Sequence, residues 1–227
     1  MTNPLVRRAR ERDAAKLATN NGTSGEERNS GCRDRSSSPP INPDDFLIVL
    51  PYGYVKFTKE EIHQLHPPAS SNRPLFIYGS LLIPHILHRA SGYETPMVDL
   101  MHYATGATLY GYCRHALRDV MFPAIVPNPE GIVSGAVVVG LSDEEKEAIK
   151  RFEGGMYDRV EVDVEVELAI EEERGYVAMK TEILKAETYV WNYTSSLEIV
   201  PVEEREWTVR PLVREAFVGV GSGHGEE

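Results

Sequence analysis

A predicted helix and a predicted strand meet in the stretch Phe152-Glu153-Gly154-Gly155-Met156-Tyr157-Asp158-Arg159. Apolar side chains recur three and four residues apart before it, which indicates a helix that ends at Gly154. Glu153 therefore lies at the carbonyl end of this helix. The partial negative charge there disfavours a carboxylate, so we expect the pKa of Glu153 to be raised.

Two aromatic residues flank Glu153 in the sequence. We expect Phe152 and Tyr157 to wall its carboxyl group into an apolar pocket, which would raise the pKa further by desolvation. A carboxyl group whose pKa is raised in this way can accept and return a proton near neutral pH, as a general acid and base must. A Glu beside Gly-Gly at a helix end also fits an ordinary surface acid, so the local pattern alone leaves both interpretations open.

A second informative segment lies upstream, in Leu75-Phe76-Ile77-Tyr78-Gly79-Ser80-Leu81-Leu82. A short apolar strand runs here into a Gly-Ser turn, whose successive backbone N–H groups can point at one place and hold a carboxylate. Gly79 would let a ligand approach the backbone closely. An ordinary strand-to-loop turn is the alternative for this tetrapeptide taken alone.

Charge and composition restrict the classes of function. The chain has 227 residues, of which 41% are hydrophobic, and its formal net charge is −11. This acidic balance argues against nucleic acid as a partner, because phosphate binding needs a basic face. No apolar run of about 18 residues is present, and the N-terminus lacks the apolar stretch of a secretory signal, so we expect a cytoplasmic protein with no membrane partner. Cys32 and Cys113 provide neither a disulfide framework nor metal-ligand spacing.

The composition changes along the chain and predicts four regions. Residues 1–45 are polar and poor in apolar side chains, so we expect disorder. Residues 46–73 form an extension that packs on the main domain, with a short helix marked by the capping box Thr58-Lys59-Glu60-Glu61. The compact domain spans 74–218, and 219–227 form a flexible tail.

The compact domain is predicted to be α+β, with a small mixed β-barrel or curled sheet flanked by helices. One strand alternates strictly, with valines on one face and Glu161, Asp163, Glu165 and Glu167 on the other. A second capping box at Ser142 begins the helix that leads to Glu153. The expected strands are 74–78, 108–114, 133–141, 159–168 and 182–191, the expected helices are 84–90, 143–153 and 203–217, and 122–127 is expected as a separate kinked segment.

The order of several motifs gives a resemblance. The strand with Tyr78-Gly79-Ser80-Leu81 is followed by Phe122-Pro123-Ala124-Ile125-Val126, then by Phe152-Glu153-Gly154 with Tyr157-Asp158-Arg159, and finally by Ala186-Glu187-Thr188-Tyr189-Val190-Trp191. This pattern resembles the gamma-glutamylcyclotransferase-like superfamily, specifically its AIG2-like branch, over roughly residues 74–218.

The resemblance implies a small β-barrel flanked by helices, with the site in a cavity at the end of the barrel. The cyclisation chemistry described below requires no metal and no cofactor. The resemblance also implies that Glu153 is the catalytic acid and that the turn after the first strand holds the α-carboxylate and amine end of a γ-glutamyl group. Arg159 matches a recurrent arginine, which we interpret as structural. The expected substrate-binding residues are Tyr78, Gly79, Ser80, Leu81, Phe122, Pro123 and Tyr157.

The chemistry of a γ-glutamyl amide fits one carboxyl group with a raised pKa. The α-amine of the substrate can close a five-membered ring on the γ-carbonyl, giving 5-oxoproline and a free amine or amino acid, and this step is intramolecular. Two alternatives stay open, a non-catalytic AIG2-like binding module and a transferase or lyase of secondary metabolism on the same fold. No local pattern reports the leaving group or the oligomeric state. His85 and His88 are interpreted as surface residues, and Cys113 as a buried structural thiol.

Overall fold

The computed structural model describes residues 57–67, 72–92, 95, 100, 103–171, 177–193, 197–201 and 207. The predicted disorder of 1–45, the predicted flexible tail 219–227 and all but Trp207 of the predicted helix 203–217 lie outside the described residues. Within the described part, no helix is long and apolar enough to cross a membrane.

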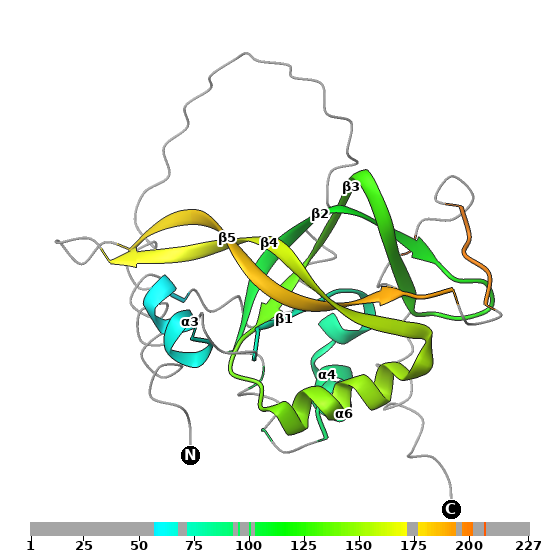
Figure 1. Cartoon of the computed structure of the whole chain (residues 1–227), viewed down its shortest axis with the longest axis horizontal. Coiled ribbons are helices and arrows are strands. Elements are labelled where there is room, and N and C mark those ends of the chain that lie inside the picture. Colours follow the sequence, from blue (N-terminus) through cyan, green and yellow to red (C-terminus); the bar gives the residue numbers. More distant parts are fainter. Residues whose placement is uncertain are drawn as a thin grey trace, which may run out of the picture.

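The described residues contain five strands that close into a small barrel (Figure 1). The strand order is β1-β3-β2-β4-β5. Neighbouring strands are antiparallel except for β1 and β5, which are parallel. This architecture confirms the predicted α+β fold with a curled sheet flanked by helices. The strands are β1 (Leu75–Ile77), β2 (Ala104–Ala116), β3 (Pro123–Val138), β4 (Tyr157–Glu171) and β5 (Val177–Trp191).

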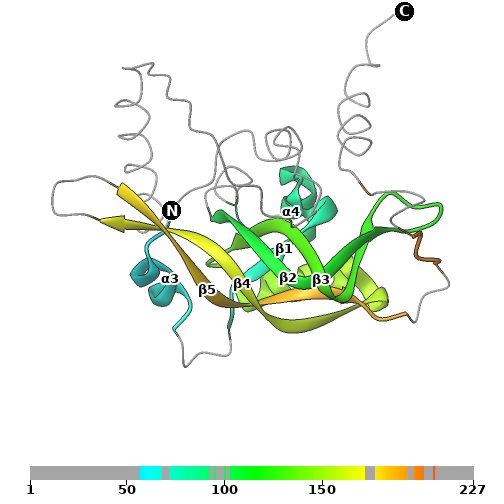
Figure 2. The same cartoon turned by 90° about the horizontal axis from the view of Figure 1, so that it is seen from above.

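Three helices flank the barrel in the described residues: α3 (Lys59–Leu65), α4 (Pro84–Ala90) and α6 (Asp143–Glu153). Both predicted capping boxes form, because the N-cap hydroxyl groups of Thr58 and Ser142 each accept a bond from the backbone N–H three residues later. Figures 1 and 2 place α3 near the end of β4 and the start of β5, away from α4 and α6.

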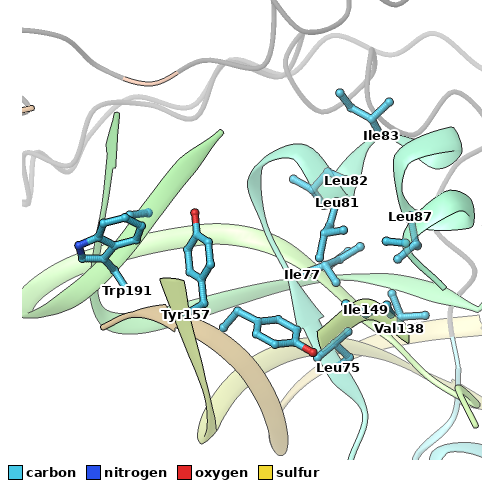
Figure 3. Packing of buried hydrophobic residues seen from close by; sticks show 14 of the residues in the cluster. Leu75, Ile77, Leu81, Leu82, Ile83, Leu87, Val138, Ile149, Tyr157 and Trp191 are labelled. Carbon is cyan, nitrogen blue, oxygen red and sulfur yellow. The ribbon is translucent and has the colours of Figure 1, made fainter. Parts of the chain in front are cut away.

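Two clusters of buried side chains hold the helices to the strands. Helices α4 and α6 contribute Leu87 and Ile149 to the first cluster, which Figure 3 shows together with Leu75 and Ile77 of β1. Helix α3 contributes Ile62 to the second cluster. Apolar burial on this scale is the main favourable contribution to folding. The second cluster also contains Phe57, Phe76, Val137, Val164 and Ala186.

The predicted break between residues 127 and 133 is wrong. The segments 122–127 and 133–141 were expected as separate pieces, but the structure joins most of both in β3. The partner strand β2 pairs with residues 123–127 and with residues 132–138 of β3, with a register shift between Tyr110 and Tyr112. Pro123 is the first residue of β3 and Pro127 is exposed, which are positions where a strand tolerates proline.

The buried face of α6 also differs from the predicted one. Phe152 is 45% exposed, so the prediction that it walls Glu153 is wrong. The buried stripe instead follows Lys146 and Ile149 to the half-buried Glu153, at the helical spacing of three and four residues. Lys146 can be buried because its Nζ donates to the backbone oxygen of Arg73 and lies 3.0 Å from Oε2 of Glu187.

Candidate active site

A small pocket lies between β1, the start of β4, the end of β5 and the end of α6. Strands β1, β3, β4 and β5 and helix α6 all contribute lining residues, so no single segment of sequence contains the site. Figure 3 shows two of its members, Leu81 and Tyr157, among the side chains of the first apolar cluster. Its lining consists of Phe76, Ile77, Tyr78, Ser80, Leu81, Phe122, Pro123, Glu153, Tyr157 and Tyr189.

One wall is the turn that follows β1. Residues Gly79–Leu82 form a single 3-10 turn. Gly79 has a φ of 63°, a left-handed conformation that favours glycine. A Cβ atom there would lie 2.3 Å from Cγ of Pro123. Glycine is therefore required both by the backbone angle and by the contact between this turn and the opposite wall.

Glu153 is the last residue of α6, and Gly154 ends the helix with a φ of 67°. Burial in the pocket raises the pKa of the Glu153 carboxyl group to about 7. Desolvation is therefore the cause of the rise, whereas the sequence pointed first to the helix end. Within the described residues, we find no hydrogen bond or ion pair to this carboxyl group.

Three tyrosines surround Glu153, and two of their hydroxyl groups are bonded inside the protein. The hydroxyl of Tyr78 donates to the backbone oxygen of Tyr189 at 2.7 Å, and that of Tyr157 donates to the backbone oxygen of Pro123 at 2.8 Å. The hydroxyl of Tyr189 is buried and has no hydrogen-bond partner among the described residues. It is the tyrosine hydroxyl that remains available to a ligand.

The structure brings the predicted site residues together. Seven of them line the pocket, and Gly79 lies in the turn against Pro123. Sequence reasoning missed three lining residues, of which Tyr189 is the polar one. The pairing of β4 with β5 could have identified Tyr189. It lies opposite Arg159, and Arg159 follows Tyr157 by two residues. The seven are Tyr78, Ser80, Leu81, Phe122, Pro123, Glu153 and Tyr157.

A network of charges lies beside the pocket. Arg159 is 3.3 Å from a carboxylate oxygen of Glu147 and 3.7 Å from one of Glu187, and Glu187 also binds Lys146. These contacts support the structural interpretation of Arg159. On the surface, His85 is exposed and His88 is half-buried. Cys113 is half-buried, so its prediction as a buried thiol is wrong.

The model of the family described as gamma-glutamyl cyclotransferase, AIG2-like, matches residues 75–209. The chain belongs to this family. Helix α3 precedes the matched region, so the AIG2-like unit begins at β1 and contains every residue that lines the pocket.

The chain is also similar to known proteins in sequence or fold. Protein AIG2 C of Arabidopsis thaliana is 34% identical over 125 residues, which are 55% of this chain and 63% of that protein. The chain thus spans just under two thirds of that relative. A solution structure of another Arabidopsis thaliana protein is 28% identical, with a TM-score of 0.41, over 66% of this chain and 83% of that one. A structure named gamma-glutamyl cyclotransferase is 16% identical, with a TM-score of 0.37, over 68% and 92%.

Proposed function

We propose that this AIG2-like protein is a gamma-glutamyl cyclotransferase, which converts a γ-glutamyl amide into 5-oxoproline and a free amine or amino acid. The observation that carries the proposal is the pKa of Glu153, which burial raises to about 7 in the pocket that also contains the Tyr78–Leu81 segment. A group that titrates near neutral pH can act as both base and acid in one reaction cycle. Membership of the family supports the same reaction class.

The γ-glutamyl part of the substrate would bind between the turn and Glu153. The backbone N–H groups of Gly79, Ser80 and Leu81 would hold the α-carboxylate, because successive N–H groups in a turn form an anion-binding concavity. Pro123 and Tyr157 would form the wall against its methylene groups. Tyr189 would donate its hydroxyl hydrogen to a substrate oxygen, since that buried hydroxyl has no partner among the described residues.

Ring closure needs proton transfers at both nitrogens, and Glu153 would perform them. Its carboxylate first takes a proton from the α-ammonium group of the substrate. The free amine then attacks the γ-carbonyl carbon, and a C–N bond forms within the five-membered ring. As the bond from this carbon to the leaving nitrogen breaks, Glu153 gives its proton to that nitrogen. The freed carboxylate then takes the second proton from the ring nitrogen and passes it to the released amine or to water. The protein supplies the folded conformation of the substrate, and the reaction itself remains intramolecular.

The test is release of 5-oxoproline from a panel of γ-glutamyl amino acids, glutathione and γ-glutamyl-lysine. The wild-type protein should release 5-oxoproline from at least one of them, and Glu153→Gln should remain folded and release none above background. Glu144→Gln removes an exposed carboxylate from the same helix and should retain wild-type activity. Binding of a γ-glutamyl compound without turnover by the folded wild type would instead identify a binding module.

A further inference from the structure

The closure of the barrel between β1 and β5 is incomplete in the main chain. Among the described residues, the two strands share one register pair, Leu75 with Glu187. The N–H of Glu187 donates to the oxygen of Pro74 at 2.9 Å. Beyond this pair lies the candidate pocket, with Phe76 and Tyr78 on one side and Tyr189 on the other. The pocket therefore opens at the seam where the main-chain pairing of these strands stops.

Side-chain hydroxyl groups bridge the seam beyond that pair. The hydroxyl of Thr188 donates to the backbone oxygen of Phe76 at 3.0 Å, and the hydroxyl of Tyr78 donates to the backbone oxygen of Tyr189 at 2.7 Å. A paired ladder would hold the two main chains about 4.8 Å apart. At the second bridge, by contrast, the side chain of Tyr78 makes the connection to the main chain of β5, beside the pocket that Tyr78 and Tyr189 both line.

Both bridging hydroxyl groups are shielded from water. Thr188 is fully buried, and Tyr78 is 8% exposed. Hydrogen bonds in such surroundings are not exchanged for bonds to water, so they fix the relative position of the groups they join. The turn Gly79–Leu82 follows Tyr78 directly, so its position relative to β5 depends on these two bonds.

We infer that Thr188 is a positioning residue, which holds β1 and its following turn at the separation from β5 that binding of the γ-glutamyl group requires. The inference rests on the proposed function. Thr188 does not line the pocket, so it would act through the backbone of Phe76 rather than by contact with substrate. Tyr78 would act at the second bridge through its hydroxyl group.

The chain offers a matched control for this inference. Thr105 in β2 is also fully buried, but its hydroxyl oxygen has no hydrogen-bond partner among the described residues. Thr188→Val and Thr105→Val remove the same hydroxyl group from a buried strand residue, yet only the first breaks a bond across the seam. Thr188→Ser retains the hydroxyl and should restore the bond.

The first measurement is the kinetics of 5-oxoproline release at a temperature where all variants are folded by circular dichroism. A displacement of the turn by a fraction of an ångström should lower kcat/KM of Thr188→Val by about ten- to a hundred-fold. Thr105→Val and Thr188→Ser should stay close to wild type. A general loss of stability would not produce this pattern, because activity is compared among folded proteins and the serine variant rescues it.

The second measurement needs no substrate and is hydrogen exchange of the backbone amides from Gly79 to Leu82. These amides should exchange faster in Thr188→Val than in Thr105→Val, and Tyr78→Phe should show the same effect if Thr188→Val fails to fold. Equal exchange in the seam and control variants would overturn the inference. An inactive wild type would contradict the proposed function alone, since the exchange experiment would still decide the role of the seam.

Discussion

An ionisable side chain lies beside each end of the β4–β5 pair, Glu153 at one end and His66 at the other. Of these two side chains, only His66 has hydrogen-bond partners among the described residues. At the end formed by Tyr157 and Trp191, the carboxyl group of Glu153 has none among the described residues. At the end covered by α3, Nδ1 of His66 lies 3.0 Å from the oxygen of Asn72, and Nε2 accepts a bond from the N–H of Gly140 at 2.8 Å. Burial shifts both pKa values toward the neutral form, upward for Glu153 and downward for His66.

Hydrogen bonding distinguishes a candidate site residue from a structural residue in this fold. His66 is neutral and fully bonded, and it joins the end of α3 to the turn after β3. The pKa of Glu153 is also shifted toward the neutral form, but its carboxyl group has no partner among the described residues, and neither has the nearby hydroxyl of Tyr189. A buried polar group without a partner carries a desolvation cost that a ligand can relieve. We therefore expect changes at Glu153 to alter activity, and changes at His66 to alter stability.

The largest expected effect is on catalysis at Glu153. Glu153→Gln should lower kcat by about 10²- to 10⁴-fold, because the amide can neither accept nor return a proton. Its free energy of unfolding should rise relative to wild type as the pH increases from about 4.5 to about 7. Over that range the carboxyl group ionises in the unfolded protein but stays largely protonated in the folded protein. Urea unfolding at several pH values checks this sign, and a loss of stability at pH 8 would make Glu153 structural.

The next effect tests the bonded charges beside the pocket. Lys146→Met should lower the free energy of unfolding by about 3 kcal/mol, because Glu187 and the oxygen of Arg73 lose a buried partner. Lys150 provides the control, since its pair with Glu147 is exposed and Lys150→Met should change stability by less than about 1 kcal/mol. Similar effects of the two changes in urea unfolding would contradict the structural role of Lys146.

At the other end of the barrel, His66→Ala should cost about 1–3 kcal/mol at pH 8, because the N–H of Gly140 loses its acceptor. The pKa of His66 is lowered in the folded state. The contribution of this residue to the free energy of unfolding of the wild type therefore falls as the pH drops below 6.5. The difference between wild type and His66→Ala should therefore shrink on acidification. Arg73, Lys146 and Glu187 are the charges that act on His66. A difference that grows instead would contradict this assignment.

The smallest effect on stability should come from Tyr189→Phe. This change removes a buried hydroxyl that has no partner in the described part of the chain, so the free energy of unfolding should change by no more than about 0.5 kcal/mol. If the hydroxyl binds substrate, the same change should raise KM or lower kcat. Tyr78→Phe is the contrasting variant, because its hydroxyl is bonded and its removal should destabilise the protein. Unchanged kinetics in Tyr189→Phe would remove this residue from the site.

Local signals in the sequence predicted local structure well. The capping boxes at Thr58 and Ser142 begin helices, and the valine alternation after Tyr157 forms β4. The same local rules failed at α6, where periodicity of apolar residues favoured Phe152 on the buried face. Two charged side chains, Lys146 and Glu153, take that face instead. Lys146 has its partner Glu187 on β5, and Glu153 lines the pocket, so only the tertiary fold reveals that ionisable groups are tolerated on this face.

The pocket lining divides in the same way. The Tyr78–Leu81 turn and Glu153 were found because each lies at a boundary between two predicted elements. Tyr189 was missed because it occupies an ordinary position in an alternating strand. Its place in the pocket depends on the pairing of β5 with β4. It also depends on the contact with Tyr78, which lies 111 residues earlier in the sequence. No pattern within one strand reports such a long-range juxtaposition.

The most direct test of this account is the pKa of Glu153 in the folded protein, measured by NMR titration of a carboxyl group labelled with ¹³C. Assignment of the signal follows from its absence in Glu153→Gln. The account predicts a pKa of about 7, raised by burial in the pocket. A value close to the ordinary 4.5 of a solvated glutamate would contradict it, because Glu153 would then be an ordinary surface carboxylate with no proton to return at neutral pH.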